Sequence, residues 1–169
     1  ETGDGAAVAF TYSSSASPAE TLVADIAASG GKALALQADS ADAVALTQAV
    51  DRAARELGRL DILVNNAGVA IAGELSSFAL ADFDHTLNVN VRAVFVATQA
   101  AVRHMGQGGA YGRVITIGST NSDRVPWAGF SVYGMSKAAI VGLTKGLARD
   151  LGPRGITVNN VQPLSLIHI

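Results

Sequence analysis

The segment DILVNNAG, residues 61–68, joins a short apolar run to a polar turn. The run Asp61–Val64 lacks the alternation of a half-exposed strand, so it predicts a strand buried on both faces, as in a parallel sheet. The NNAG turn follows at once, and its Gly68 would let a flat ligand approach the backbone closely. The segment therefore predicts a buried strand that ends beside a ligand.

Similar apolar runs lie on both sides of this segment and alternate with helical patterns. The expected strands are Ala6–Tyr12, Lys32–Gln37, Asp61–Val64, Arg113–Gly118 and Ile156–Val161. The expected helices run from Ser17 to Ser29, from Ser40 to Gly58, from Asp82 to Met105 and from Ser131 to Leu151. This alternation predicts an α/β fold, with a parallel sheet covered by helices on each side.

Residue types at the helix starts give more local expectations. Ser17 suits an N-cap, Pro18 the first helical position, and Glu20 completes a capping box with Ser17. Ser40 is expected to cap the following helix, which should end at Gly58. These assignments fix where two of the helices should begin.

Composition excludes several classes of function. The 169 residues suffice for one domain, and 12 basic against 14 acidic residues indicate neither a nucleic-acid surface nor a polybasic membrane patch. The absence of cysteine excludes disulfides, a thiol nucleophile and a cysteine metal site. With no run of about 18 apolar residues and no signal-peptide pattern, we expect a cytoplasmic protein without a membrane span or metal.

Polar clusters follow three of the expected strands. NNAG follows the third strand, GSTNS the fourth, and QP the fifth. Parallel sheets bind ligands beyond the carboxyl ends of their strands, so these clusters should face one crevice.

Tyr133 and Lys137 are four residues apart and share one face of the last helix. A free phenol has a pKa near ~10, and a nearby ammonium in desolvated surroundings favours the phenolate, which would make Tyr133 a usable general acid or base. A solvated tyrosine and lysine at this spacing is the commoner case. Ser119 could likewise be a cap, Gly68 an ordinary turn residue and Asn90 a satisfied core amide.

Five motifs together resemble the short-chain dehydrogenase/reductase family. They are LVNNAG (63–68), LNVNVRAVFVATQAA (87–101), RVITIGS (113–119), YGMSKAA (133–139) and GLARDLGPRGITVNNVQP (146–163). The resemblance implies a Rossmann-type, doubly wound parallel sheet and an oxidoreductase that transfers a hydride between NADP(H) and a carbonyl or alcohol substrate.

The resemblance also implies roles for individual residues. Tyr133 would be the proton donor or acceptor, Lys137 would lower its pKa and bind the nicotinamide ribose, and Ser119 would hold the substrate oxygen. Asn90 would carry a water that links Lys137 to solvent. Because the spacing from Ser119 to Tyr133 is one residue longer than usual, Thr120 or Ser122 could compete with Ser119.

Cofactor contacts follow from the same resemblance. Asp39 and Ser40 would flank the adenine, and Asn66, Ala67 and Gly68 would line the adenosine ribose side. Relatives that prefer NAD usually carry an acidic residue where this chain has Tyr12-Ser13-Ser14. Without that carboxylate a 2′-phosphate is not repelled, so NADP is favoured over NAD.

Parts of the family pattern are missing from this sequence. No glycine-rich loop with its first strand precedes residue 6, and no last strand follows Pro163. We therefore expect a partial domain over 1–163, with strands at 6–12 and 61–64 that flank an absent strand, and a non-native tail at 164–169. The intact protein should form homodimers or homotetramers through its two long helices.

The loop GSTNSDRVP keeps a second function open. It resembles a subgroup that includes 3-oxoacyl-reductase-like proteins and cyclic-di-GMP-binding biofilm dispersal factors. The alternative is therefore a sensor that binds a cyclic dinucleotide on the same fold without turnover.

Overall fold

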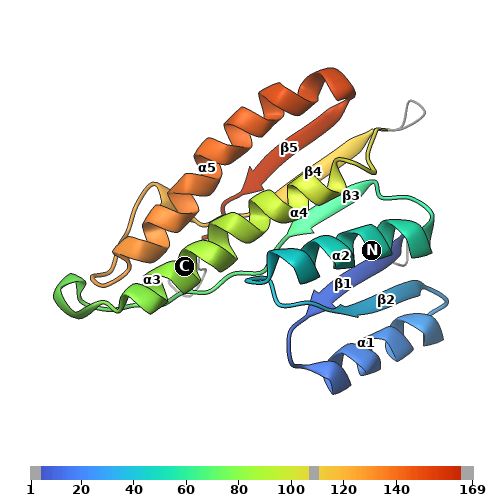
Figure 1. The fold of residues 1–169 in the computed structure, drawn as a ribbon, viewed down its shortest axis with the longest axis horizontal. Helices are drawn as coiled ribbons and strands as arrows, with labels where there is room; N and C mark the ends of the chain where they lie inside the picture. Colours follow the sequence, from blue (N-terminus) through green and yellow to red (C-terminus); the bar gives the residue numbers. More distant parts are fainter. Residues whose placement is uncertain (1–4, 107–110, 165–169) are drawn as a thin grey trace.

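The computed structural model describes residues 5–106 and 111–164 (Figure 1). Its strands are β1 (Ala7–Tyr12), β2 (Lys32–Gln37), β3 (Ile62–Asn65), β4 (Gly112–Ile117) and β5 (Ile156–Val161). Its α-helices are α1 (Ala16–Ala28), α2 (Ala43–Leu57), α3 (Leu80–Leu87), α4 (Ala93–Ala101) and α5 (Ser131–Leu151). The predicted α/β fold is confirmed. Of the expected tail at 164–169, only Leu164 lies within the described residues.

The strands form two separate parallel sheets. β1 pairs with β2, and β4 lies between β3 and β5. All five arrows point the same way, and α1 and α2 flank the two-stranded sheet (Figure 1). The division between the sheets falls between β1 and β3, where the sequence led us to expect an absent strand.

One face of the three-stranded sheet carries the main core. Val114 of β4 and Ile156 and Val158 of β5 are buried in a cluster with side chains of α2, α4 and α5. The opposite face is less covered, because Ile62 is 56% and Val64 50% exposed. The expectation of helices on each side therefore holds at β1 and β2, but the second face of β3 stays open within the described part of the chain.

The long helix expected between residues 82 and 105 is interrupted. It begins earlier, at Leu80, passes through a π-helical turn at Asn88–Arg92, and ends as α4 at Ala101. A π-helical turn changes which carbonyl each amide can reach, and such turns are frequent at functional sites. No periodicity argument indicated it, because the apolar stripe continues on both sides.

Both predicted N-caps are wrong. α1 begins at Ala16 with Ser15 at its N-cap, so Ser17 and Pro18 lie inside the first turn instead of at the N-cap and first helical position. The N-cap makes no side-chain hydrogen bond, so the capping box expected between Ser17 and Glu20 does not form. α2 is capped by Asp42, whose Oδ1 accepts from the N–H groups of Val44 and Ala45 at 2.9 and 3.1 Å. A charged acceptor two residues beyond Ser40 satisfies the free amides of that first turn. The predicted stop of α2 at Gly58 is confirmed by its φ of 82°.

Candidate active site

The carboxyl ends of β3, β4 and β5 meet at a crevice of about 380 Å³. It is lined by Asn66, Gly68, Val69, Ala70, Ile117, Gly118, Ser119, Tyr133, Lys137, Pro163 and Leu164. The three polar clusters that follow these strands in sequence therefore do converge in space, and α5 adds Tyr133 and Lys137 to them.

Lys137 is a buried cation beside the ring of Tyr133. Its side chain is buried, and Nζ lies 5.8 Å from the centroid of the Tyr133 ring. Nζ donates to the carbonyl of Ile117 at 2.8 Å, and burial lowers the pKa of Lys137. No carboxylate pairs with it within residues 5–106 and 111–164. Its charge is thus available to a phenolate or a bound ligand. Because Lys137 is buried, Tyr133 and Lys137 are not a solvated pair on the helix surface.

Asn90 lies in the π-helical turn and is 1% exposed. Its Nδ2 donates to the Val69 carbonyl and to Ser136 Oγ, both at 2.9 Å, while its Oδ1 accepts from the Val69 N–H at 2.8 Å. These bonds fix the loop that follows Gly68. Both side-chain donors are occupied, so a water at this residue would have to bind the remaining lone pair of Oδ1 or the backbone.

Ser136 belongs to this network, although the sequence did not indicate it as a site residue. It is fully buried, and its Oγ donates to the Tyr133 carbonyl at 2.7 Å while it accepts from Asn90. A serine inside a helix commonly bonds back to the preceding turn, which was the only signal available from the sequence. Its second bond connects the helix that carries Tyr133 to the π-helical turn.

Ser119 combines a capping role with a place in the crevice. Its Oγ accepts from the Asn121 N–H at 3.1 Å and caps the short turn Thr120–Ser122, yet the residue also lines the crevice. Neither Thr120 nor Ser122 lines it, and Ser122 Oγ is buried without a hydrogen-bond partner. The position of Ser119 therefore favours it over both competitors.

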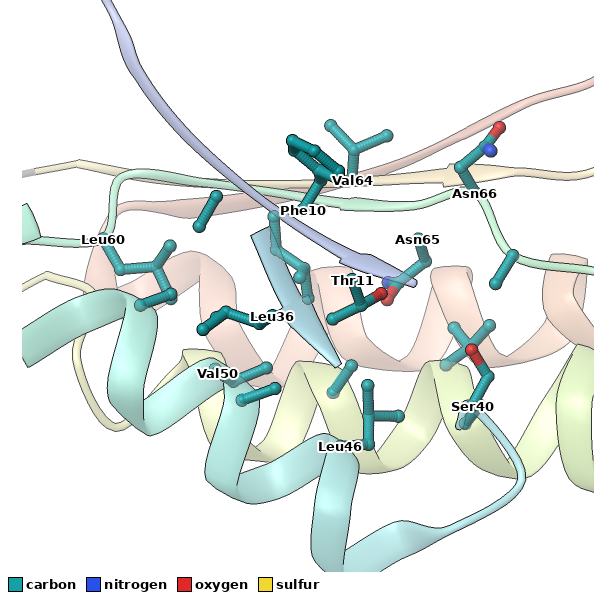
Figure 2. A pocket seen from close by; sticks show the side chains of 18 of the residues that line it. Phe10, Thr11, Leu36, Ser40, Leu46, Val50, Leu60, Val64, Asn65 and Asn66 are labelled. Atoms are coloured by element: carbon teal, nitrogen blue, oxygen red, sulfur yellow. The ribbon is translucent and has the colours of Figure 1, made fainter. Parts of the chain in front are cut away.

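Four of the residues expected at the cofactor, namely Ser40, Asn66, Ala67 and Gly68, line one or both of two cavities. Asn66 and Gly68 line the crevice, and a Cβ on Gly68 would lie 3.4 Å from Asn90 Oδ1 and 3.6 Å from Lys137 Nζ. Asn66 also lines a second cavity of about 670 Å³, together with Ala67 and Ser40 (Figure 2).

Two expected contacts line neither cavity. The Ser13 carbonyl accepts from Gln37 Nε2 at 3.1 Å, and Asp39 Oδ1 accepts from the Ala41 N–H at 2.8 Å. Across the described chain, no group of three His, Cys, Asp or Glu side chains could hold a metal, and no helix there is both long and apolar enough to cross a membrane.

Comparison with known proteins identifies the family. A family profile described as "short chain dehydrogenase" matches residues 2–166. The "Cyclic-di-GMP-binding biofilm dispersal mediator protein" of Escherichia coli K12 is 44% identical over 160 residues, which are 95% of this chain and 62% of that protein. A short-chain dehydrogenase/reductase from Serratia marcescens has a solved structure with a TM-score of 0.91 and 61% identity, over 96% of this chain and 65% of that chain.

A further solved structure, a short chain dehydrogenase from Burkholderia cenocepacia in complex with NADP, matches with a TM-score of 0.90 and 58% identity, again over 96% and 65% of the two chains. This chain thus spans somewhat less than two thirds of the length of these relatives. The match covers nearly all of the chain and includes both sheets and the crevice, so the chain belongs to the short-chain dehydrogenase family.

Proposed function

We propose that the whole protein is an oxidoreductase that interconverts a carbonyl and an alcohol with NADP(H). The observation that carries this proposal is the buried, carboxylate-free Lys137 beside Tyr133 in a crevice that Ser119 also lines. Tyr133 supplies or accepts the proton at the substrate oxygen, and the Lys137 charge stabilises its phenolate. Ser119 positions that oxygen by donating its hydroxyl hydrogen, since its Oγ already accepts from Asn121.

Bound NADP(H) would supply or take up the hydride. Lys137, which lines the crevice, would bind its nicotinamide ribose. Asn66, Ala67 and Gly68 would line its adenosine ribose side, and Asn66 and Gly68 line the same crevice as Lys137. Ser13, Asp39 and Ser40 would hold its adenosine side. The absence of a carboxylate at Ser13 and the NADP bound by the Burkholderia cenocepacia relative both favour NADP over NAD.

A second function has one specific observation in its favour. The Escherichia coli relative is named for cyclic-di-GMP binding and is 44% identical to this chain. A sensor that binds a cyclic dinucleotide without turnover would use the same crevice, but it would not need the buried Lys137 beside Tyr133.

Substitution of Tyr133 separates the two functions. The whole protein is supplied with NADPH and a panel of small carbonyl compounds, and Tyr133→Phe is expected to reduce kcat at least about 100-fold while NADPH binding persists. Tyr111→Phe is the matched control, since Tyr111 is exposed and lies outside the crevice. Absence of turnover on every compound, together with tight cyclic-di-GMP binding, would favour the sensor.

We also propose that the whole protein forms a homodimer or homotetramer through α4 and α5. Phe95 on α4 is 46% exposed, and α5 presents the small residues Ala138, Gly142 and Gly146 to solvent, which permits close helix packing. Phe95→Glu should lower the mass measured by sedimentation. The small carbonyl or alcohol substrate and the cytoplasmic location expected from the sequence stay predictions.

A further inference from the structure

Two further aromatic rings continue from Tyr133 on the side away from Lys137. The Phe130 ring meets the Tyr133 ring edge-on, with centroids 6.1 Å apart and planes at 83°, and the Trp127 ring lies 6.2 Å from that of Phe130. Ring pairs at such spacings and angles attract one another. Trp127, Phe130 and Tyr133 therefore form an aromatic series, which begins at the crevice and leads out through the loop before α5.

The positions of these residues on α5 set the direction of the aromatic series. Phe130 is the N-cap of α5, and Phe130, Tyr133 and Lys137 share one helix face because they are three and four residues apart. Lys137 Nζ donates to the Ile117 carbonyl at the end of β4, and a Cβ on Gly68 would lie 3.6 Å from it. Lys137 thus lies toward the strand ends, where it would bind the nicotinamide ribose. The aromatic series lies beyond Tyr133 in the opposite direction, so a substrate whose oxygen meets Tyr133 extends along it.

A second loop runs beside the aromatic series. The Gly73 N–H donates to the Gly129 carbonyl at 3.1 Å, so the loop after β3 contacts the loop before α5 (Figure 1). Gly129 has a φ of 84°, and a Cβ on it would lie 3.4 Å from the Gly73 nitrogen and carbonyl oxygen. The loop after β3 also contributes Val69 and Ala70 to the crevice. This contact therefore holds the lining of the crevice and the aromatic series next to each other.

Charge restricts what can lie there. Among the described residues that line the crevice, Lys137 alone is charged. Between residues 119 and 133 the only charged residues are Asp123 and Arg124, and neither lines the crevice. A carboxylate or phosphate on the substrate would thus meet no counter-charge in the crevice other than the Lys137 that the phenolate and the cofactor need. An aromatic group would meet the aromatic series.

We propose that the substrate is an uncharged aryl ketone, or the corresponding secondary alcohol, whose aromatic group packs against Phe130 and Trp127. This assignment rests on the function proposed above. In reduction, the carbonyl carbon accepts the hydride of NADPH, the C=O π bond breaks, and the oxygen takes the proton of the Tyr133 hydroxyl, so that a secondary alcohol and NADP⁺ result. Tyr133 then regains a proton from solvent.

A comparison of ketones tests the substrate class. The whole protein is supplied with NADPH and either acetophenone or 2-octanone, which have the same number of carbon atoms, and pyruvate is included as a carbonyl compound with a carboxylate. The kcat/KM for acetophenone should exceed those for 2-octanone and pyruvate at least about tenfold.

Substitution of Trp127 then locates the aromatic group. Trp127→Ala should raise the KM for 2-acetonaphthone at least about tenfold with little change in kcat, because Trp127 would contact the bound aromatic group and not the reacting atoms. The KM for 2-butanone, which has no aromatic group, should change less than about twofold. Trp127→Phe keeps a ring and should restore most of the binding. Tyr111→Ala is the control, since Tyr111 is an exposed ring outside the crevice and its loss should change neither KM.

A binding measurement separates this inference from the proposed function. By calorimetry, 2-acetonaphthone should bind the unmodified protein saturably and Trp127→Ala at least about tenfold more weakly. If no carbonyl compound is reduced and this difference is still found, the proposed function fails while the aromatic site stands. Two results would overturn the aromatic site. They are equal kcat/KM for acetophenone and 2-octanone, and an equal effect of Trp127→Ala on 2-acetonaphthone and 2-butanone.

Discussion

At the residue scale, the position of Tyr133 depends on side chains that never enter the crevice. Ser136 bonds to the Tyr133 carbonyl and to Asn90, and Asn90 bonds in turn to the backbone of Val69. This chain of contacts joins the start of α5 to the loop after β3. A buried polar network, in which Ser136 and Asn90 each bond to two neighbouring residues, thus holds the start of α5 and the loop after β3 in place beside the crevice.

Ser136→Ala tests the contribution of this hydrogen-bond network to stability. The variant leaves one Asn90 donor and the Tyr133 carbonyl without their partner, so the free energy of unfolding should fall by about 1–3 kcal/mol, measured by urea denaturation. Ser131→Ala, at an exposed position of the same helix, should change it by less than about 0.5 kcal/mol. Equal effects of the two substitutions would contradict the network.

Gly118 is a second position where packing restricts the residue type. A Cβ there would overlap the Asn160 amide, whose Nδ2 would lie 2.9 Å away and whose polar atoms are buried without a hydrogen-bond partner. Gly118→Ala should therefore lower the free energy of unfolding by about 1–3 kcal/mol. Asn160→Ala in the same chain should recover much of this loss, because the overlap disappears, and a double-mutant cycle by urea denaturation measures the coupling. Additive effects would rule out the contact.

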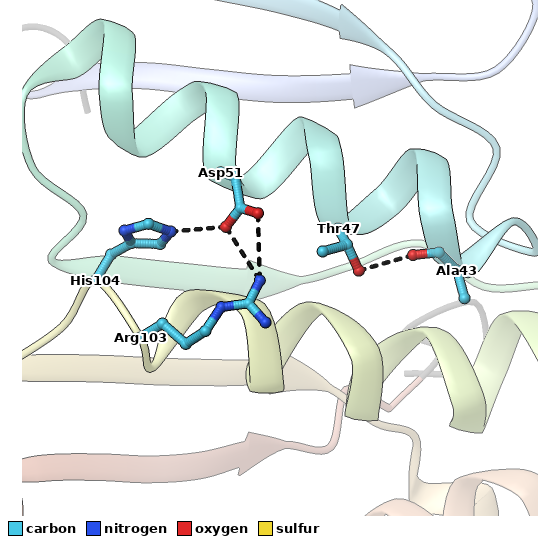
Figure 3. Close-up of polar contacts among 5 residues, drawn as sticks. All are labelled: Ala43, Thr47, Asp51, Arg103 and His104. Atoms are coloured by element: carbon cyan, nitrogen blue, oxygen red, sulfur yellow. Dashed lines mark hydrogen bonds and ion pairs between the residues drawn. The ribbon is translucent and has the colours of Figure 1, made fainter.

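At the element scale, a charged group connects the middle of α2 to the residues just after α4. Asp51 of α2 accepts from Arg103 at 3.1 Å and contacts His104 Nε2 at 2.7 Å, both just after α4 (Figure 3). The His104 hydrogen bond is the main cause that holds the pKa of Asp51 below its ordinary value of 3.8, with Arg103 adding to it. The group is partly exposed, so its contribution to stability is small.

The interaction of Asp51 with Arg103 and His104 predicts that the stability of the fold depends on pH. Because the folded pKa of Asp51 is depressed, its stabilisation is fully present above pH 3.8 and is lost as the pH falls through the lower folded value. Asp51→Asn should cost about 0.5 kcal/mol at pH 7, and the difference from the unmodified chain should shrink below pH 3.8. Asp84→Asn, an exposed carboxylate without an ion pair among the described residues, should show no such trend in thermal unfolding.

At the scale of the whole molecule, the core consists of two unequal parts. The larger cluster joins α2, α4 and α5 to β4 and β5, while a smaller one joins Leu36 and Ala38 to Ala49 and Ala53 of α2. α2 contributes to both clusters, so it is the element that couples the two sheets.

This division predicts an order of hydrogen exchange. Amides of Val114 and Thr116 in the central strand β4 should exchange slowest, because β4 is paired on both sides and covered by the larger cluster. Amides of Ala9 and Thr11, on the edge of β1 that pairs with no strand among the described residues, should exchange at least about tenfold faster. Mass spectrometry of peptic fragments checks this, and uniform protection across both sheets would contradict the division into two sheets.

The elements themselves were largely predictable. The strands at 32–37 and 156–161 match the expected bounds, because apolar runs between turn residues are a local signal. Helix starts were less predictable. Ser40 and Asp42 both suit an N-cap, and only the direction of the chain at Ala43 decides which oxygen meets the free amides. The π-helical turn at Asn88–Arg92 leaves no trace in the apolar periodicity.

The sequence by itself determined the alternation of strands and helices and the polar clusters at the strand ends, since both follow from the residues nearest in the chain. Only the tertiary structure decided that Lys137 is buried against Ile117, 20 residues away, and that Ser136 meets Asn90, 46 residues away. Such contacts depend on how whole elements pack against one another, and the local pattern of side chains along the sequence does not determine that packing.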